Sequence, residues 1–146
     1  MKTKSKIWFP WIAVPLGGLL VLGLTFFGYL LVYLSIEALF FSANPQAMDT
    51  GLVRRGFMLF IVVVYLLLEL TKIPKLIKAV ILVGPYAMLL VTIFLQFYEQ
   101  LSAALLITVI LTAFSAGLVK ITKRPWYYYL ALGVAVSGAL FYGWPR

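Results

Sequence analysis

Short clusters of charge divide this chain into five apolar windows, and this pattern most constrains the fold. A membrane-spanning helix needs about 20 apolar residues to cross roughly 30 Å of hydrocarbon. The windows cover residues 8–41, 52–73, 76–98, 101–119 and 126–144. With 64% hydrophobic and 11% charged residues, the composition is far from that of soluble domains. We expect an all-α integral membrane protein, a single transmembrane domain over residues 1–146 with about five spanning helices.

The first two windows need separate arguments. The first has no charged residue from Ile7 to Ile36 and is longer than one crossing requires. It implies a tilted helix, a bend near Pro15, Gly17 and Gly18, or an extension among the headgroups. The second is the weakest, because only 13 residues separate Arg55 from Glu69. It spans a bilayer only if the charged side chains at both ends snorkel.

The distribution of basic residues predicts the orientation, because cytoplasmic loops collect Lys and Arg. Five spans with a cytoplasmic amino terminus place nine basic residues inside and three outside. The inner residues are Lys2, Lys4, Lys6, Lys72, Lys75, Lys78, Lys120, Lys123 and Arg124, and the outer ones are Arg54, Arg55 and Arg146. If the second window did not span, the count would become six on each side. We therefore expect a multi-pass protein of a bacterial cytoplasmic membrane, with its carboxyl terminus outside.

Two residue types are absent, and this limits the metal sites and reactions that the chain could support. The chain has no Cys and no His. It therefore lacks thiolate and imidazole ligands and the commonest general base. We predict no catalytic residues, no metal, no cofactor and no nucleic-acid partner, which favours a protein that is not an enzyme.

Two stripes of small residues recur at a spacing of four, a pattern typical of closely packed membrane helices. They comprise Ala104, Thr108, Thr112 and Ala116 in the fourth window, and Ala131, Ala135, Ala139 and Gly143 in the fifth. Each stripe occupies one helix face. These faces either pack within one monomer or bind another membrane protein or a second copy.

Three charged residues near the outer side are candidates for a ligand or lipid site. Arg54 and Arg55 begin the second window and could bind a phosphate or carboxylate, or pair with Glu37 or Asp49. Snorkelling to lipid phosphates is the simpler alternative. Glu37 ends a stripe of polar residues and could handle ions, although its position places it among the headgroups.

Glu69 and Lys72 are one helical turn apart in the sequence. We predict that they form a local ion pair at the inner interface.

Three functions fit these features. The first is a non-catalytic subunit of a larger membrane complex, such as a transporter accessory or scaffold subunit. The second is a small homo-oligomeric transporter or channel, for example for an anionic solute or lipid. The third is a lipid-modifying enzyme, for which only Glu37, Asp49 and the tyrosines offer reactive groups.

Residues 85–145 loosely resemble the small membrane subunit of tripartite tricarboxylate transporters. The shared features are Lys123-Arg124-Pro125-Trp126 and a last helix that ends in Phe-x-x-x-Pro, from Phe141 to Pro145. The chain departs from that family in lacking its Gly-Pro-x-Phe-Pro type loop and in having five predicted spans where four are expected. We therefore assign the chain to no family on this basis.

Overall fold

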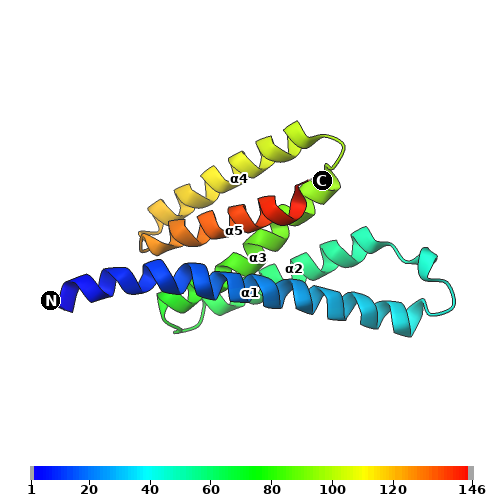
Figure 1. The fold of residues 1–146 in the computed structure, drawn as a ribbon, viewed down its shortest axis with the longest axis horizontal. Coiled ribbons are helices and arrows are strands. Elements are labelled where there is room, and N and C mark those ends of the chain that lie inside the picture. The colour runs from blue at the N-terminus through cyan, green and yellow to red at the C-terminus, as the bar shows by residue number, and fades with distance from the viewer. Residues whose placement is uncertain (1, 145–146) are drawn as a thin grey trace.

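The protein is a bundle of five α-helices in the computed structural model, which describes residues 2–144, and side chains from residue 9 onward (Figure 1). Helix makes up 85% of the structure, and no strand occurs among the described residues. The elements are α1 (Lys2–Phe40), the short 3₁₀ helix η1 (Pro45–Ala47), α2 (Thr50–Glu69), α3 (Lys75–Gln96), α4 (Leu101–Ile121) and α5 (Tyr127–Gly143). Arg146 and the side chains of Lys2, Lys4 and Lys6 lie outside this description.

Four of the described helices are long and apolar enough to cross a membrane, namely α2, α3, α4 and the Phe9–Phe40 part of α1. The fifth, α5, has 17 residues and is shorter than its predicted window. At 1.5 Å per residue it is about 26 Å long, just below the usual hydrocarbon thickness. Pro125 and the turn before it delay its start, and the helix ends at Gly143.

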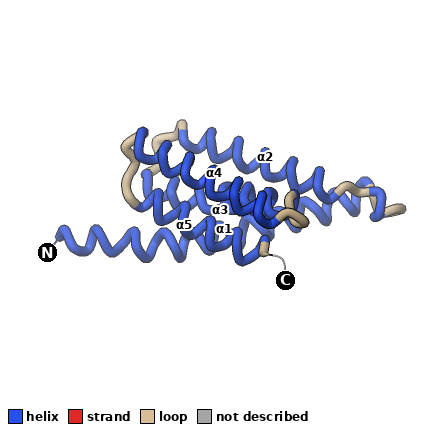
Figure 2. Tube along the Cα trace, turned by 90° about the horizontal axis from the view of Figure 1, so that it is seen from above, coloured by secondary structure: helices blue, strands red, loops and turns tan. Residues whose placement is uncertain are grey.

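Helix α3 forms the core of the bundle. It packs against α1, α2, α4 and α5 (Figure 2). Within its most apolar stretch 61% of the residues are buried, compared with 6% in α1 and in α2. Its largest buried side chains, which include Met88, Leu90 and Phe94, are at most 2% exposed. The other helices each present a face to α3, and α1 and α5 also pack on each other. Most of the surface of α1 and α2 is left uncovered.

Small residues allow α1 and α3 to approach closely. A Cβ atom added to Gly84 of α3 would lie 2.9 Å from Val21 and would also collide with Thr25. Gly17 and Gly18 of α1 face Val80 and Val83 of α3 in the same way. We predicted a bend near Pro15 and these two glycines as one explanation for the length of the first window. Instead, α1 continues as one helix through them, and the glycines lie at the contact with α3.

The excess length of α1 extends beyond the bundle. With 39 residues, α1 is about 58 Å long. The tip of the α1–α2 hairpin projects past the end where α3 meets α4 (Figure 1). Large apolar residues on this tip, such as Leu39 and Phe40, are about three-quarters exposed. An extension at the outer end is one of the three explanations for the long first window, and α1 does project beyond the other helices (Figure 1).

The packing of α3 on α1 yields a first prediction. Gly84→Ala should lower the free energy of unfolding by about 1–3 kcal/mol, because the added methyl group forces Val21 and Thr25 away. Thermal unfolding of the purified protein in detergent measures this change. Gly133→Ala is the matched control, since no atom lies within 4 Å of its added Cβ. Equal stability of the two variants would contradict the close packing.

Candidate functional site

The strongest polar interaction joins the end of α2 to the turn after α4. Arg124 Nη1 lies 2.6 Å from Glu69 Oε2, and this is the one ion pair among the described side chains of residues 9–144. Both side chains are mostly buried, with exposed fractions of 30% for Arg124 and 15% for Glu69. The predicted local pair of Glu69 with Lys72 is wrong. The carboxylate instead faces the loop that precedes α5.

Two tyrosines complete the group, which we call the polar cluster: Tyr65, Glu69, Arg124 and Tyr128. The Tyr65 hydroxyl donates to Glu69 Oε1, so both carboxylate oxygens accept a bond. Arg124 Nη1 also donates to the Tyr128 hydroxyl at 3.0 Å, and its guanidinium carbon lies 5.1 Å from the centre of that ring. Tyr65 and Glu69 are one turn apart on α2, so helix geometry holds that pair. Arg124 lies in the turn before α5 and reaches Tyr128 in the first turn of that helix.

Lys78 fixes the turn between α2 and α3. Its side chain is 8% exposed, and Nζ donates to the carbonyl oxygens of Glu69 at 2.9 Å and Thr71 at 2.8 Å. The carbonyl groups at a helix C-terminus have no partners within the helix and carry partial negative charge. The Lys78 ammonium group supplies donors to them and holds the end of α2, with Glu69, against α3.

The turn after α4 places Arg124 through a specific backbone conformation. Lys123 has a φ of 53°, in the left-handed region. The amide of Arg124 donates to the Val119 carbonyl, and that of Lys123 donates to the Lys120 carbonyl, both at 3.1 Å. This is the Schellman pattern, in which a left-handed residue closes the helix end. Reversal of the chain at this point directs Arg124 toward α2.

Arg124 stays charged in this setting. Partial desolvation acts to lower the pKa of its guanidinium group, but the bonds to Glu69 and Tyr128 outweigh it, and the net effect raises the pKa of Arg124 above its usual value. The pair is therefore an ionic contact throughout the physiological range.

A cleft of about 270 Å³ begins at the polar cluster and runs between α2 and α4. Its floor comes from α3 and α5, through Leu82, Tyr86 and Leu132. Its sides come from α2 and α4, through Leu66 and Leu118. The result is an apolar cleft with charged and hydroxyl groups at one end, an arrangement that suits binding of an amphiphile.

No group of three or more His, Cys, Asp or Glu that could hold a metal ion occurs in the part of the chain that is described. Both oxygens of Glu69 already accept hydrogen bonds, so the cluster can position charge and bind a ligand.

The predicted residues Arg54 and Arg55 gather at the first turn of α2. A Cβ atom built on Gly51 would lie 3.8 Å from Arg55 Nη2 and 4.0 Å from Arg54 Nη2. Arg55 Nε donates to the Gly51 carbonyl at 3.2 Å, whereas the buried Nε of Arg54 has no hydrogen-bond partner. The two residues thus lie close together, at the opposite end of the bundle from Arg124.

The ion pairs considered for these arginines are not formed among the described side chains of residues 9–144. Asp49 instead caps α2, because its Oδ1 accepts from the amides of Gly51 at 2.9 Å and Leu52 at 3.1 Å. Glu37 is half-buried on α1 and makes no ion pair within that same range.

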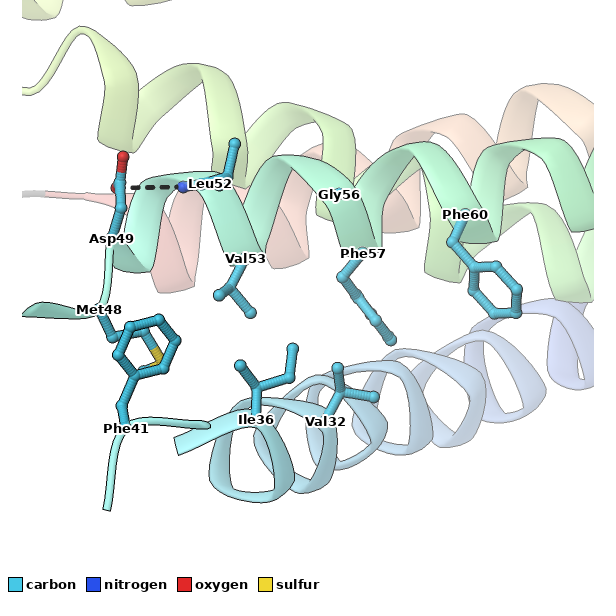
Figure 3. Close-up of a pocket in the computed structure, with 10 residues that line it drawn as sticks. All are labelled: Val32, Ile36, Phe41, Met48, Asp49, Leu52, Val53, Gly56, Phe57 and Phe60. Atoms are coloured by element: carbon cyan, nitrogen blue, oxygen red, sulfur yellow. Dashed lines mark hydrogen bonds between the residues drawn. The ribbon is translucent and has the colours of Figure 1, made fainter. Parts of the chain in front are cut away.

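An apolar groove of about 500 Å³ lies between the ends of α1 and α2, next to Asp49 (Figure 3). Val53 and Phe57 of α2 point toward Ile36 and Val32 of α1 across this groove, and Phe41 lies against Met48 at its end. Asp49 is its one charged residue, and the carboxylate is used in the helix cap. Because Oδ1 of Asp49 accepts both capping bonds, this carboxylate is partly engaged in the fold, and the rest of the lining is apolar.

Both predicted stripes of small residues contribute to the bundle interior. Ala131, Ala135 and Ala139 of α5 are fully buried, and Gly143 packs against Phe94 of α3. On α4, Ala104 and Thr108 are buried, while Thr112 and Ala116 are half-buried. In this structure the stripes face the chain's own helices.

Sequence reasoning placed Arg124 among the inner basic residues, but connected neither Arg124 nor Tyr128 with Glu69. One signal was available. Tyr65 with Glu69, and Arg124 with Tyr128, are both spaced by four residues, and both pairs lie at boundaries predicted for the same side of the membrane.

Comparison of the chain with protein-family models, curated proteins and solved structures gives no match. The loose resemblance to the tricarboxylate transporter subunit thus gains no support from these comparisons.

The polar cluster yields a second prediction, tested by a double-mutant cycle. Glu69→Gln and Arg124→Gln should each lower the free energy of unfolding by about 1–3 kcal/mol, below the cost at a fully buried pair because both groups retain some solvent contact. The two losses should not add in the double variant, with a coupling energy of about 1 kcal/mol or more. The measurement is again thermal unfolding in detergent.

Arg55→Gln is the control for this cycle, because Arg55 bonds only within its own helix. It should change stability by no more than about 0.5 kcal/mol. Strict additivity of the Glu69 and Arg124 variants would contradict the ionic contact.

Proposed function

We propose that this chain is a non-catalytic integral membrane subunit of a larger membrane complex, acting as a scaffold or accessory to a transporter. The observation that carries the proposal is the uncovered apolar surface of α1 and α2. Each buries only 6% of its most apolar stretch within the chain. Lipid can cover such surface within the hydrocarbon, but not on the projecting tip.

The tip is the part that most needs a protein partner. From Trp11 to Phe40, α1 is about 45 Å long, against roughly 30 Å of hydrocarbon. Bringing that length into the hydrocarbon would require a tilt near 50°, beyond the 0–40° range of membrane helices. A neighbouring membrane protein that extends beyond the bilayer on the same side would cover Leu39 and Phe40.

The small hydroxyl groups offer no path for a solute through this bundle alone. Those of Thr25, Thr92 and Ser115 donate to carbonyl groups of their own helices at 2.8 to 2.9 Å. A transporter or channel lines its path with polar or ionisable groups that face a cavity. This favours a supporting role over transport by the isolated chain.

The proposed topology has five crossings, with the amino terminus and the Arg124 end of the bundle in the cytoplasm of a bacterium. The carboxyl terminus and the α1–α2 tip then lie outside. The support is the bias of nine basic residues to three, together with four helices that meet the length and hydropathy needed for crossing. The short α5 would complete the fifth crossing with aromatic residues at both of its ends.

A homo-oligomeric transporter or channel for an anionic solute or lipid is the second candidate. It is favoured by the Arg54 Nε atom, which is buried and has no hydrogen-bond partner. A neighbouring copy or an anion could satisfy this donor, together with Arg55.

Native mass measurement after gentle detergent extraction from the source membrane tests the proposed function. The untagged chain should be recovered with a stoichiometric larger membrane protein, because its uncovered faces and tip need a partner. A Leu39→Ser and Phe40→Ser double variant should reduce this recovery, and Leu106→Ser, on the exposed face of α4, is the matched control. Recovery only as copies of the chain would contradict the subunit proposal and support the homo-oligomer.

A further inference from the structure

The cleft between α2 and α4 has the shape and chemistry of a site for a lipid. Apolar side chains line most of it, among them Leu66, Leu82, Leu118 and Leu132. The polar cluster closes one end. A site of this kind buries a hydrocarbon chain along its walls and binds a polar headgroup where charged groups converge.

The cleft opens sideways from the bundle. Its two rims are Leu66 of α2 and Leu118 of α4, which are 58% and 46% exposed. Both helices pack on α3, while the pairs of helices with substantial contact do not include α2 with α4. A chain lying in the bilayer can therefore enter between them without passing through the protein.

The net positive charge near the polar cluster favours an anionic ligand at this end of the cleft. The two turns at this end of the bundle, together with the helix ends next to them, carry six cationic residues and one acid. The cations are Lys72, Lys75, Lys78, Lys120, Lys123 and Arg124, and the acid is Glu69. The excess of positive charge remains after the Glu69–Arg124 pair is formed, so a negative headgroup is favoured over a zwitterionic one.

Arg124 keeps hydrogen-bond donors for such a headgroup. A guanidinium group has five N–H donors in a planar fork. The bonds from Arg124 to Glu69 and Tyr128 both use Nη1. Neither contact engages Nε or Nη2, and the Arg124 side chain is 30% exposed.

We propose that this cleft binds one anionic phospholipid, with an acyl chain between α2 and α4 and its phosphate on the free N–H edge of Arg124. The bound lipid would bridge α2 and α4 and rigidify the end of the bundle. The site is distinct from Arg54 and Arg55, and its existence does not depend on the proposed role as a subunit. The group recognised at this end is a phosphate, which either a lipid headgroup or a soluble phosphate compound could supply.

The test uses the full chain, purified and delipidated in a neutral detergent. Native mass spectrometry and thermal unfolding are recorded with dioleoylphosphatidylglycerol, with dioleoylphosphatidylcholine, and with glycerol phosphate or inorganic phosphate alone. Phosphatidylglycerol should bind with one tightly retained molecule and raise the melting temperature. A similar effect of phosphatidylcholine would overturn the anionic selectivity, and a similar effect of soluble phosphate would overturn the role of the acyl chain.

Variants assign the binding to the cleft without breaking the ion pair. Leu118→Trp fills the cleft at an exposed rim and should weaken phosphatidylglycerol binding about tenfold, because excluding two methylene groups corresponds to that factor. Leu106→Trp places the same side chain on an exposed part of α4 outside the cleft and should leave binding unchanged. Unaltered binding in Leu118→Trp, or equal loss in both variants, would overturn the proposal.

Discussion

The packing of four helices around α3 is the constraint on which the rest of the structure depends. In lipid, helices gain no hydrophobic energy from meeting each other, so close van der Waals packing must hold them. Gly84 allows α1 to approach α3, and Gly143 allows α5 to approach Phe94. Because α3 is the helix that all four others contact, a loss of packing on it would weaken the whole bundle, although α1 and α5 also pack on each other.

The polar cluster adds a directional contact to this non-directional packing. It joins α2 to the turn before α5, two segments that are distant in the sequence, while Lys78 holds the end of α2 on α3. The ion pair thereby fixes the position of α2 relative to α5 and forms the closed end of the cleft. The opposite end has no comparable contact, and there the α1–α2 hairpin projects from the bundle.

The sequence alone predicts the helices well, because apolar windows and their charged boundaries depend only on local composition. It does not predict the Glu69–Arg124 pair, since the spacing that suggested Lys72 reports only neighbours on one helix. A bend near Pro15, Gly17 and Gly18 was one of three explanations for the long first window. The close packing of Gly17 and Gly18 on α3 was not predicted, because it depends on which helix faces them. The cleft combines residues from four helices and therefore requires the tertiary arrangement.

The central claim is that α2 crosses the membrane, so that the turns on either side of the polar cluster lie together in the cytoplasm. The chain has no Cys, so single cysteines can be introduced and labelled selectively. With a membrane-impermeant maleimide on intact cells, Asn44→Cys should be labelled, whereas Thr71→Cys and Lys123→Cys should react only after permeabilisation. Labelling of Thr71→Cys but not Lys123→Cys on intact cells would place the two turns on opposite sides and contradict the account.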